Sequence, residues 1–136
     1  MPFPIEEKYI IETESELNVK FPAEFKNRMI SLNGGEIEEV IENEEEDYIY
    51  WLYPFFDKSD KKRISRTCNH IGLETENSRK WENFPKNTIA IGHDGSGNKL
   101  VLIHNGNGVL SENLYFWDHE TGEIEKIAES IKELDG

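Results

Sequence analysis

The division of the chain into hydrophobic runs and polar turns is clearest between Thr88 and Ile124, where three β-rich runs are separated by turns that contain glycine. β-Branched, aliphatic and aromatic side chains fill the runs, and such side chains pack well on a pleated surface. Asn and Gly in the turns tolerate the positive φ that tight hairpins require. The pattern predicts an antiparallel meander of three or four strands, with runs at 89–91, 100–103 and 114–117 and turns at 94–98, 105–108 and 121–122.

The first third of the chain has the spacing of two helices. One is expected from Ile5 to Leu17, because part of one face is apolar at steps of three and four residues. Pro22 opens the second helix at its first position, where a missing N–H costs nothing. The two are predicted to form an αα-hairpin that covers the sheet. The facing positions are Ile10, Ile11, Glu14 and Leu17 in the first helix and Phe25, Met29, Ile30 and Leu32 in the second, with stops at Asn18 and Asn33-Gly34-Gly35.

The remaining segments supply more strands and helices. Glu36–Asp47, which holds eight acids and no base, is expected to form a strand and then an acidic turn at Asn43–Asp47, or a short helix. Tyr48–Tyr53 predicts a strand that ends at Pro54. Apolar residues at helical spacing occur again in the middle of the chain and near its C-terminus. The positions are Ile64, Cys68 and Ile71 in one helix, Leu73, Asn77, Trp81 and Phe84 in another, and Ile124, Ile127, Ile131 and Leu134 in a C-terminal helix over 125–134.

Charge narrows the range of partners. The chain of 136 residues carries 28 acidic and 15 basic side chains, a net charge of −13. Nucleic acid and anionic membranes need a concentrated positive field and are disfavoured. A basic protein partner is favoured, because an acidic face speeds encounter, although solubility alone is an alternative reason for the charge. The N-terminus has no signal-peptide pattern, so a cytoplasmic location is expected, and the single Cys68 excludes an internal disulfide.

The glycine-rich turn at Gly92–Gly97 lacks the features of two ligand loops that it resembles. It has neither the glycine order of a phosphate loop nor a helix after it. Asp94-x-Ser96-x-Asn98 has the oxygen spacing that opens a calcium loop, but Lys99 and Asn105 stand where a glycine and an acid are required. A hairpin turn is the better interpretation.

Catalytic and metal motifs are also incomplete. His93, His104 and His119 could converge on zinc if their strand ends lay together, with Asp94, Asp118 and Glu120 as further ligands, but no paired histidine spacing is present. Neither Ser96 nor Ser111 lies in a nucleophile elbow. The sequence predicts no catalytic site, no metal and no cofactor.

Three motifs occur in order along the chain. The first joins Glu14-x-x-Leu17, Phe21-Pro22-x-x-Phe25 and Asn33-Gly34-Gly35. The second is the strand and glycine turn of 89–98, and the third is the strand and polar turn of 116–120. From about Ile5 to Leu134, this succession resembles the SMI1/KNR4 family.

The resemblance implies an α+β fold in one domain over 1–136. A curved antiparallel β-sheet would be surrounded by an N-terminal αα-hairpin, a middle helical segment and a C-terminal helix. It also implies membership of the SUKH superfamily, whose bacterial members neutralise toxins, often nucleases, as immunity proteins. Fungal relatives are cell-wall and signalling regulators, and neither branch is enzymatic.

The leading hypothesis is an immunity protein that blocks a basic toxin domain by stoichiometric binding. A regulatory adaptor without a toxin is the second hypothesis, and a metal-dependent hydrolase using His93 and His119 is the third. The oligomeric state stays open between a monomer and a weak dimer. Glu14, Phe21, Pro22, Asn33 and Gly34 are assigned to folding. The expected partner-binding residues, whose aromatic members could instead be sheet core, are Glu39, Glu42, Glu44, Glu45, Glu46, Asp47, Tyr48, Tyr50, Trp51 and Tyr53.

Overall fold

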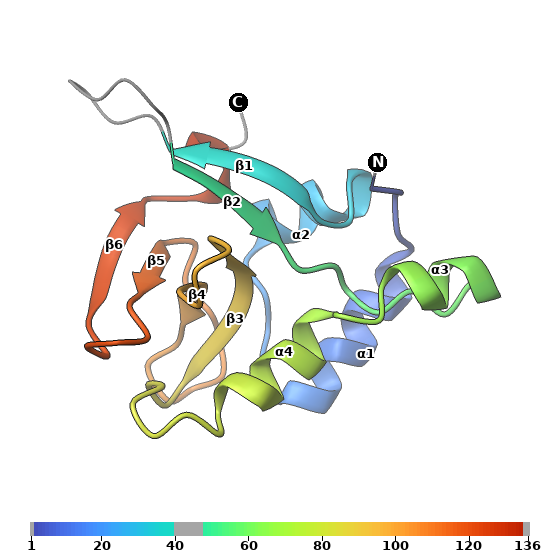
Figure 1. Cartoon of the computed structure of the whole chain (residues 1–136). Coiled ribbons are helices and arrows are strands. Elements are labelled where there is room, and N and C mark those ends of the chain that lie inside the picture. Colours follow the sequence, from blue (N-terminus) through green and yellow to red (C-terminus); the bar gives the residue numbers. More distant parts are fainter. Residues whose placement is uncertain (1, 40–47, 135–136) are drawn as a thin grey trace.

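A computed structural model of the chain describes residues 2–39 and 48–134 (Figure 1). The predicted acidic turn at Asn43–Asp47 lies outside the described residues. No helix in the described part is both long and apolar enough to cross a membrane. In chain order the elements are α1 (Glu7–Leu17), α2 (Ala23–Ser31), β1 (Gly35–Glu39), β2 (Tyr48–Leu52), α3 (Lys61–Arg66), α4 (Ile71–Ser78), β3 (Thr88–His93), β4 (Lys99–Ile103), β5 (Leu114–Trp117), β6 (Ile124–Ala128) and the 3₁₀ helix η1 (Ile131–Glu133).

The strands form one antiparallel sheet in the order β1-β2-β3-β4-β5-β6, so each strand lies beside its neighbours in sequence. The sheet curls into a half-barrel (Figure 1). This confirms the α+β class and the predicted meander. Glycines at the three meander turns have positive φ, as the turn chemistry requires. They are Gly95 and Gly97, Gly106 and Gly108, and Gly122.

The sheet is held together weakly at one place, between β2 and β3. Only Trp51 and Leu52 of β2 pair with β3, opposite His93 and Gly92, whereas β3 and β4 pair along their whole length. The described ribbon of β1 and β2 therefore swings away from the β3–β6 meander (Figure 1). Gly92 permits the contact, because a Cβ there would lie 2.8 Å from the Trp51 carbonyl oxygen.

The core lies between the sheet and the helices. Phe21, Phe25 and Phe55 pack together with ring centroids 5.0 to 6.0 Å apart. On the meander, the buried Trp117 meets Phe84 edge to face at 4.9 Å. Such aromatic pairs add stability beyond the area they bury.

The two N-terminal helices follow one another as predicted but have different neighbours. α1 packs beside α4, and α2 packs beside η1. The predicted inward positions Ile10, Leu17, Phe25 and Met29 are buried. Two others are wrong: Ile11 lies beside the buried face of α1 instead of on it, and Leu32 is the extended residue after α2, so both are exposed. Asn18 ends α1 in the left-handed conformation, and Pro22 stands one residue before α2.

The middle segment is helical, but its predicted boundaries are wrong. Ile71 begins α4 instead of continuing the helix of Ile64, and α4 ends at Ser78, before Trp81. The buried residues of α4 are Ile71, Gly72, Thr75 and Ser78, whereas the predicted Leu73 is exposed. The Thr75 hydroxyl accepts a hydrogen bond from the Ala90 N–H of β3 at 3.0 Å, so a polar contact joins this face of α4 to the sheet.

The predicted C-terminal helix over 125–134 is also wrong. Residues 124–128 form strand β6, and only the short turn η1 follows. The register shifts beside β6, where Tyr115 pairs with Lys126 but Leu114 pairs with Ala128, so Ile127 is the extra residue of a β-bulge. A bulge breaks the two-residue period of a strand. The apolar step from Ile124 to Ile127 therefore imitates a helix.

Buried polar side chains hold the C-terminal ends of α1 and α2 in place. Glu14, which is 3% exposed, accepts a hydrogen bond from the Phe21 N–H at 2.8 Å and lies 3.8 Å from the Lys26 ammonium. The Asn33 side chain both donates to the Phe55 carbonyl oxygen and accepts from the Phe55 N–H. These contacts join α1 to the start of α2, and the end of α2 to the segment after β2, which supports the structural role assigned to Glu14 and Asn33.

Glu14→Ala should lower the free energy of unfolding by about 1–3 kcal/mol, because the Phe21 N–H stays buried without its acceptor. Glu14→Gln keeps an acceptor oxygen and should cost less. Glu16→Ala, at an exposed position of the same helix, is the control and should change little. Urea unfolding of the three variants measures the difference. Equal effects for Glu14→Ala and Glu16→Ala would show that the buried contact does not hold the fold.

Candidate functional site

A groove of about 810 Å³ opens where the β1–β2 ribbon swings away from the meander. This volume lies in the range of ligand pockets in proteins. Its walls come from β1, β2, the β3–β4 turn, β5 and β6. The lining residues are Glu39, Tyr48, Ile49, Tyr50, Trp51, Asp94, Ser96, Asn98, Phe116, Glu125, Lys126 and Ile127.

Aromatic and aliphatic side chains form the accessible wall of the groove. Tyr48 is 51% exposed, Ile49 is 39% exposed and Trp51 is 38% exposed, and all three belong to β2. Tyr50 is buried and packs on Phe116 of β5, with ring centroids 6.3 Å apart. Successive side chains of a strand point to opposite faces, so Tyr48 lies on one face of β2 and Ile49 and Trp51 lie on the other. Exposed apolar side chains grouped on one strand in this way mark interaction sites.

The groove carries negative charge. Glu39, Asp94 and Glu125 line it, against one base, Lys126. The Lys126 ammonium lies 2.6 Å from the Glu129 carboxylate, which largely offsets its charge. Acidic groups along low-dielectric walls concentrate the field and raise the local concentration of a cationic partner.

Hydrogen bonds hold the groove side chains in place. The Tyr50 hydroxyl donates to Glu39 Oε1 at 3.0 Å, and the Trp51 indole N–H donates to Glu36 Oε1 at 3.2 Å. Burial raises the pKa of Tyr50, and the Glu39 carboxylate raises it further. Tyr50 therefore remains a protonated donor at neutral pH, and its hydrogen bond holds the Glu39 side chain in the lining of the groove.

His93 supports the floor behind Trp51. Its ring stacks between Trp51 at 5.6 Å and Tyr53 at 5.3 Å. Burial lowers the pKa of His93, and the nearby Lys99 ammonium lowers it further. The imidazole is thus neutral at pH 7, and it adds no positive charge that would weaken the acidic groove.

The β3–β4 turn is a hairpin turn, as predicted. Asp94 Oδ1 accepts from the Ser96 N–H at 2.8 Å, and the Asn98 amide donates to Asp94 Oδ2 at 3.0 Å. Asn98 Oδ1 also accepts from the His119 N–H at 3.1 Å, which connects this turn to the β5–β6 turn. The turn thereby forms one end of the groove, and these hydrogen bonds hold it to the β5–β6 turn.

The three histidines considered for zinc make separate contacts. His93 stacks on aromatic rings, His104 Nδ1 accepts from two glycine N–H groups of its own turn, and His119 contacts Asn98. Among residues 2–39 and 48–134, no three metal-ligating side chains are grouped closely enough to hold an ion.

The structure gathers some of the predicted partner-binding residues and separates others. Glu39, Tyr48, Tyr50 and Trp51 line the groove, whereas Tyr53 is 4% exposed and belongs to the core, with its hydroxyl accepting from the Lys99 ammonium at 2.6 Å. Sequence reasoning missed the opposite wall, because β6 was predicted to be helical. Glu42, Glu44, Glu45, Glu46 and Asp47 lie outside the described residues.

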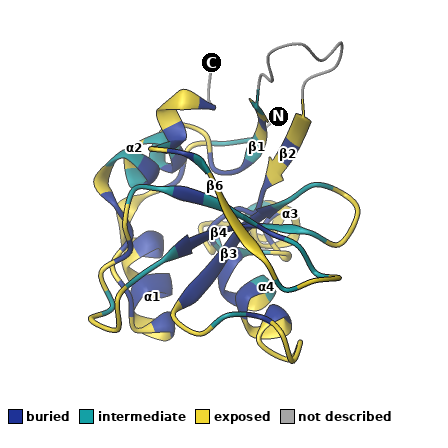
Figure 2. Cartoon of the chain, turned by 90° about the vertical axis from the view of Figure 1, so that its left-hand side faces the viewer, coloured by how far each residue is buried: buried dark blue, intermediate teal, exposed yellow. Residues whose placement is uncertain are grey.

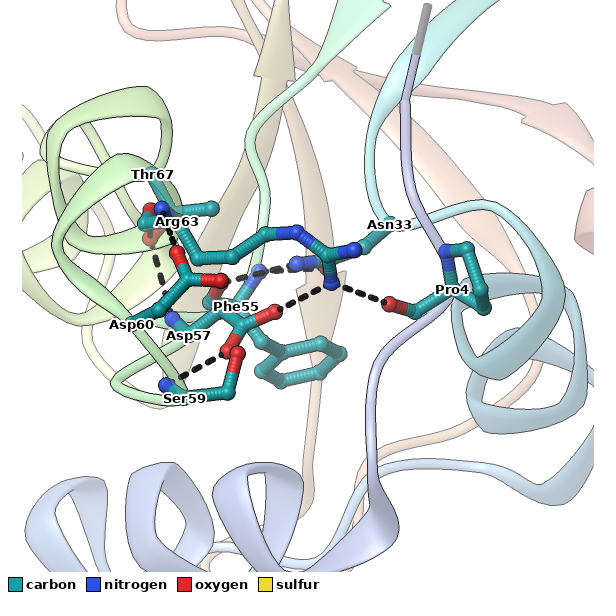
Figure 3. A network of polar contacts seen from close by, with 8 residues as sticks. All are labelled: Pro4, Asn33, Phe55, Asp57, Ser59, Asp60, Arg63 and Thr67. Atoms are coloured by element: carbon teal, nitrogen blue, oxygen red, sulfur yellow. Dashed lines mark hydrogen bonds and ion pairs between the residues drawn. The ribbon is translucent and has the colours of Figure 1, made fainter.

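A second, smaller pocket of about 340 Å³ lies between the N-terminal segment and α3. Arg63 crosses it and donates to Asp57 Oδ2 at 3.3 Å and to the Pro4 carbonyl oxygen at 3.4 Å (Figure 3). Burial alone would raise the pKa of Asp57, but hydrogen bonds from Ser59 and Arg63 outweigh it and leave the pKa lowered. Because Arg63 and Asp57 satisfy one another, this network fixes the N-terminal segment, and the groove is the stronger candidate.

Comparison with protein families identifies the family of the chain. The profile of the SMI1 / KNR4 family (SUKH-1) matches residues 4–134, nearly the whole chain. A search of curated proteins gave no match. The family match covers both walls of the groove.

Gly92→Ala should close or distort the groove as well as destabilise the sheet. The added Cβ must push the Trp51 backbone away, which should cost about 1–3 kcal/mol, as overpacking does. The indole N–H signal of Trp51 in an NMR spectrum should shift. Gly106→Ala is the control, since its Cβ would meet nothing within 4 Å and only its φ of 95° is unfavourable. An unchanged Trp51 signal in Gly92→Ala would contradict the role of this glycine.

Proposed function

Because the chain belongs to the SMI1 / KNR4 family (SUKH-1), we propose that it is a protein-binding module without catalytic activity, and that it neutralises a basic toxin domain as an immunity protein. The observation that supports this most is the groove, which combines exposed aromatic side chains with uncompensated acids. Toxins that act on nucleic acid carry basic substrate surfaces, which match this charge.

The mechanism of inhibition is occlusion. The acids at Glu39, Asp94 and Glu125 meet a basic, substrate-binding surface, while Tyr48 and Trp51 supply buried contact area. Aromatic anchors contribute much of the energy of an interface, whereas charge chiefly sets the association rate and the specificity. The toxin is then inactive because its substrate cannot reach it, and no bond in either protein is changed.

The acidic residues Glu42 to Asp47 belong to the same proposal. They follow Glu39 in sequence, and Tyr48 comes directly after them. Their charge adds to the attraction for a basic partner, so their contribution is expected in the association rate more than in the dissociation rate.

Glu125→Lys should weaken binding of the partner at least about tenfold, because like charges placed together in an interface cost several kcal/mol. Glu76→Lys is the matched control: it makes the same charge change on α4, at an exposed position outside the groove. The two variants and the wild type would each be immobilised and used to capture partners from a lysate of the native cell. The bound proteins would be washed at low and then at high salt. One basic partner in equimolar amount, retained by the wild type and Glu76→Lys and lost by Glu125→Lys, is expected.

The captured partner then enters a protection assay. Cells that express it should survive when the wild-type chain is co-expressed, and should die with the Glu125→Lys variant. Reversal of charge at Glu44, Glu45 and Glu46 should slow association and flatten its salt dependence. A partner that is not toxic, or several signalling proteins bound weakly, would contradict an immunity role and support a regulatory adaptor.

A further inference from the structure

The outer edge of β6 is open. Among the described residues β6 pairs with β5 alone, and it is the last strand of the sheet. Most of its residues are exposed, and it runs as a largely exposed strand across one side of the molecule (Figure 2). Exposed strand edges are templates for pairing with another chain.

The register shows which backbone groups of β6 face outward. The Asp118 N–H donates to the Glu123 carbonyl oxygen at 2.9 Å, so these two residues form a hydrogen-bonded pair beside the turn. Such pairs alternate with non-hydrogen-bonded pairs along an antiparallel ladder. Trp117 with Ile124 is therefore non-hydrogen-bonded, and Phe116 with Glu125 is hydrogen-bonded. It follows that Ile124 and Lys126 direct their N–H and C=O groups away from β5.

β2 is open on the side that faces the same groove. The Tyr53 N–H donates to the Ile91 carbonyl oxygen at 2.8 Å, and the pairing with β3 stops at Trp51. By the same alternation, Ile49 turns its backbone groups toward the side of β3 but has no partner in that strand. The groove therefore lies beside two strands, β2 and β6. In the described part of the chain, each of them has backbone N–H and C=O groups that pair with no other strand.

We propose that the partner adds an extended segment to the outer edge of β6 as an antiparallel or parallel strand, and that a Lys or Arg of this segment enters the groove. This mode of binding rests on the proposed function. Main-chain hydrogen bonds to Ile124 and Lys126 provide affinity, and the groove selects the side chain. The cation meets Glu39, Asp94 and Glu125 and approaches the ring face of Tyr48 or of Trp51, where cation–π attraction adds to the charge interaction.

Charge decides the occupant of this edge. A second copy of the chain could pair through β6, but each copy has a net charge of −13 and brings further acids to the groove. An acidic or neutral segment would leave the groove carboxylates without a counter-charge. A basic segment offsets them, and its alternating side chains suit a site with one solvent side and one groove side.

The test is an NMR titration of the full chain with three synthetic decapeptides. The first alternates Thr and Lys, the second alternates Thr and Glu, and the third is the Thr–Lys peptide N-methylated at every residue. The third has the charge of the first but cannot donate the ladder hydrogen bonds. We expect the first peptide alone to shift the amide signals of 124–128 and the indole signal of Trp51, with at least tenfold weaker binding by the other two.

Two variants at one position separate charge from strand addition. Lys126→Pro removes an outward N–H and leaves the β5–β6 ladder intact, because edge strands tolerate proline at such positions. Lys126→Gln removes only the charge. Binding of the Thr–Lys peptide should fall at least tenfold in Lys126→Pro and stay within about twofold in Lys126→Gln. Amide signals of β5 and β6 outside the substituted residue report whether the sheet is retained.

Other outcomes overturn the inference. Equal binding of the N-methylated peptide, or equal binding by both variants, would mean that charge alone attracts the segment. Shifts at 124–128 that depend on protein concentration without peptide would make a second copy the occupant. If no peptide shifts β6 while capture of a basic partner still requires Glu125, strand addition is wrong and the proposed function stands. If capture does not require Glu125, the proposed function fails independently.

Discussion

The short contact between β2 and β3 shapes the whole molecule. Gly92 lets the Trp51 carbonyl oxygen approach to a distance that any Cβ would prevent, yet only Trp51 and Leu52 pair with β3. The sheet is thus continuous at one point and open beyond it. Where β2 and β3 are paired the sheet covers the core, and where they separate the groove is left between the strands. The fold and the candidate site have one cause, a sheet that is joined through two residue pairs.

The residues that carry the family resemblance act mainly on folding. Glu14 and Asn33 satisfy buried backbone groups, and Phe21 packs with Phe25 and Phe55. Buried polar groups must be paired, so these positions allow few alternatives. The accessible groove wall of β2 and the edge of β6 lie outside those motifs. Membership of the family therefore accounts for the architecture, whereas the groove combines motif residues such as Asp94 and Phe116 with side chains of β2 and β6 that lie outside the motifs.

The meander could be predicted from sequence because its signals are local. Glycine and asparagine in the turns and apolar runs between them determine each hairpin without reference to the rest of the chain. The C-terminal strand β6 could not be predicted from sequence, because the bulge at Ile127 turns the two-residue spacing of a strand into the three-residue spacing of a helix. The aromatic run at Tyr48–Tyr53 indicated a partner surface, but only the fold separates the exposed Trp51 from the buried Tyr53. The far wall of the groove is brought there by tertiary structure alone.

Hydrogen–deuterium exchange of the chain, alone and with the partner identified by capture, tests the central claim most directly. Backbone amides that gain a hydrogen-bonding partner exchange more slowly. If the groove receives the partner, residues 124–128 and 48–51 should become protected in the complex, while α3 at residues 61–66 should exchange at an unchanged rate. Protection confined to α3, with no change in β6 and β2, would contradict the assignment of the groove as the binding site.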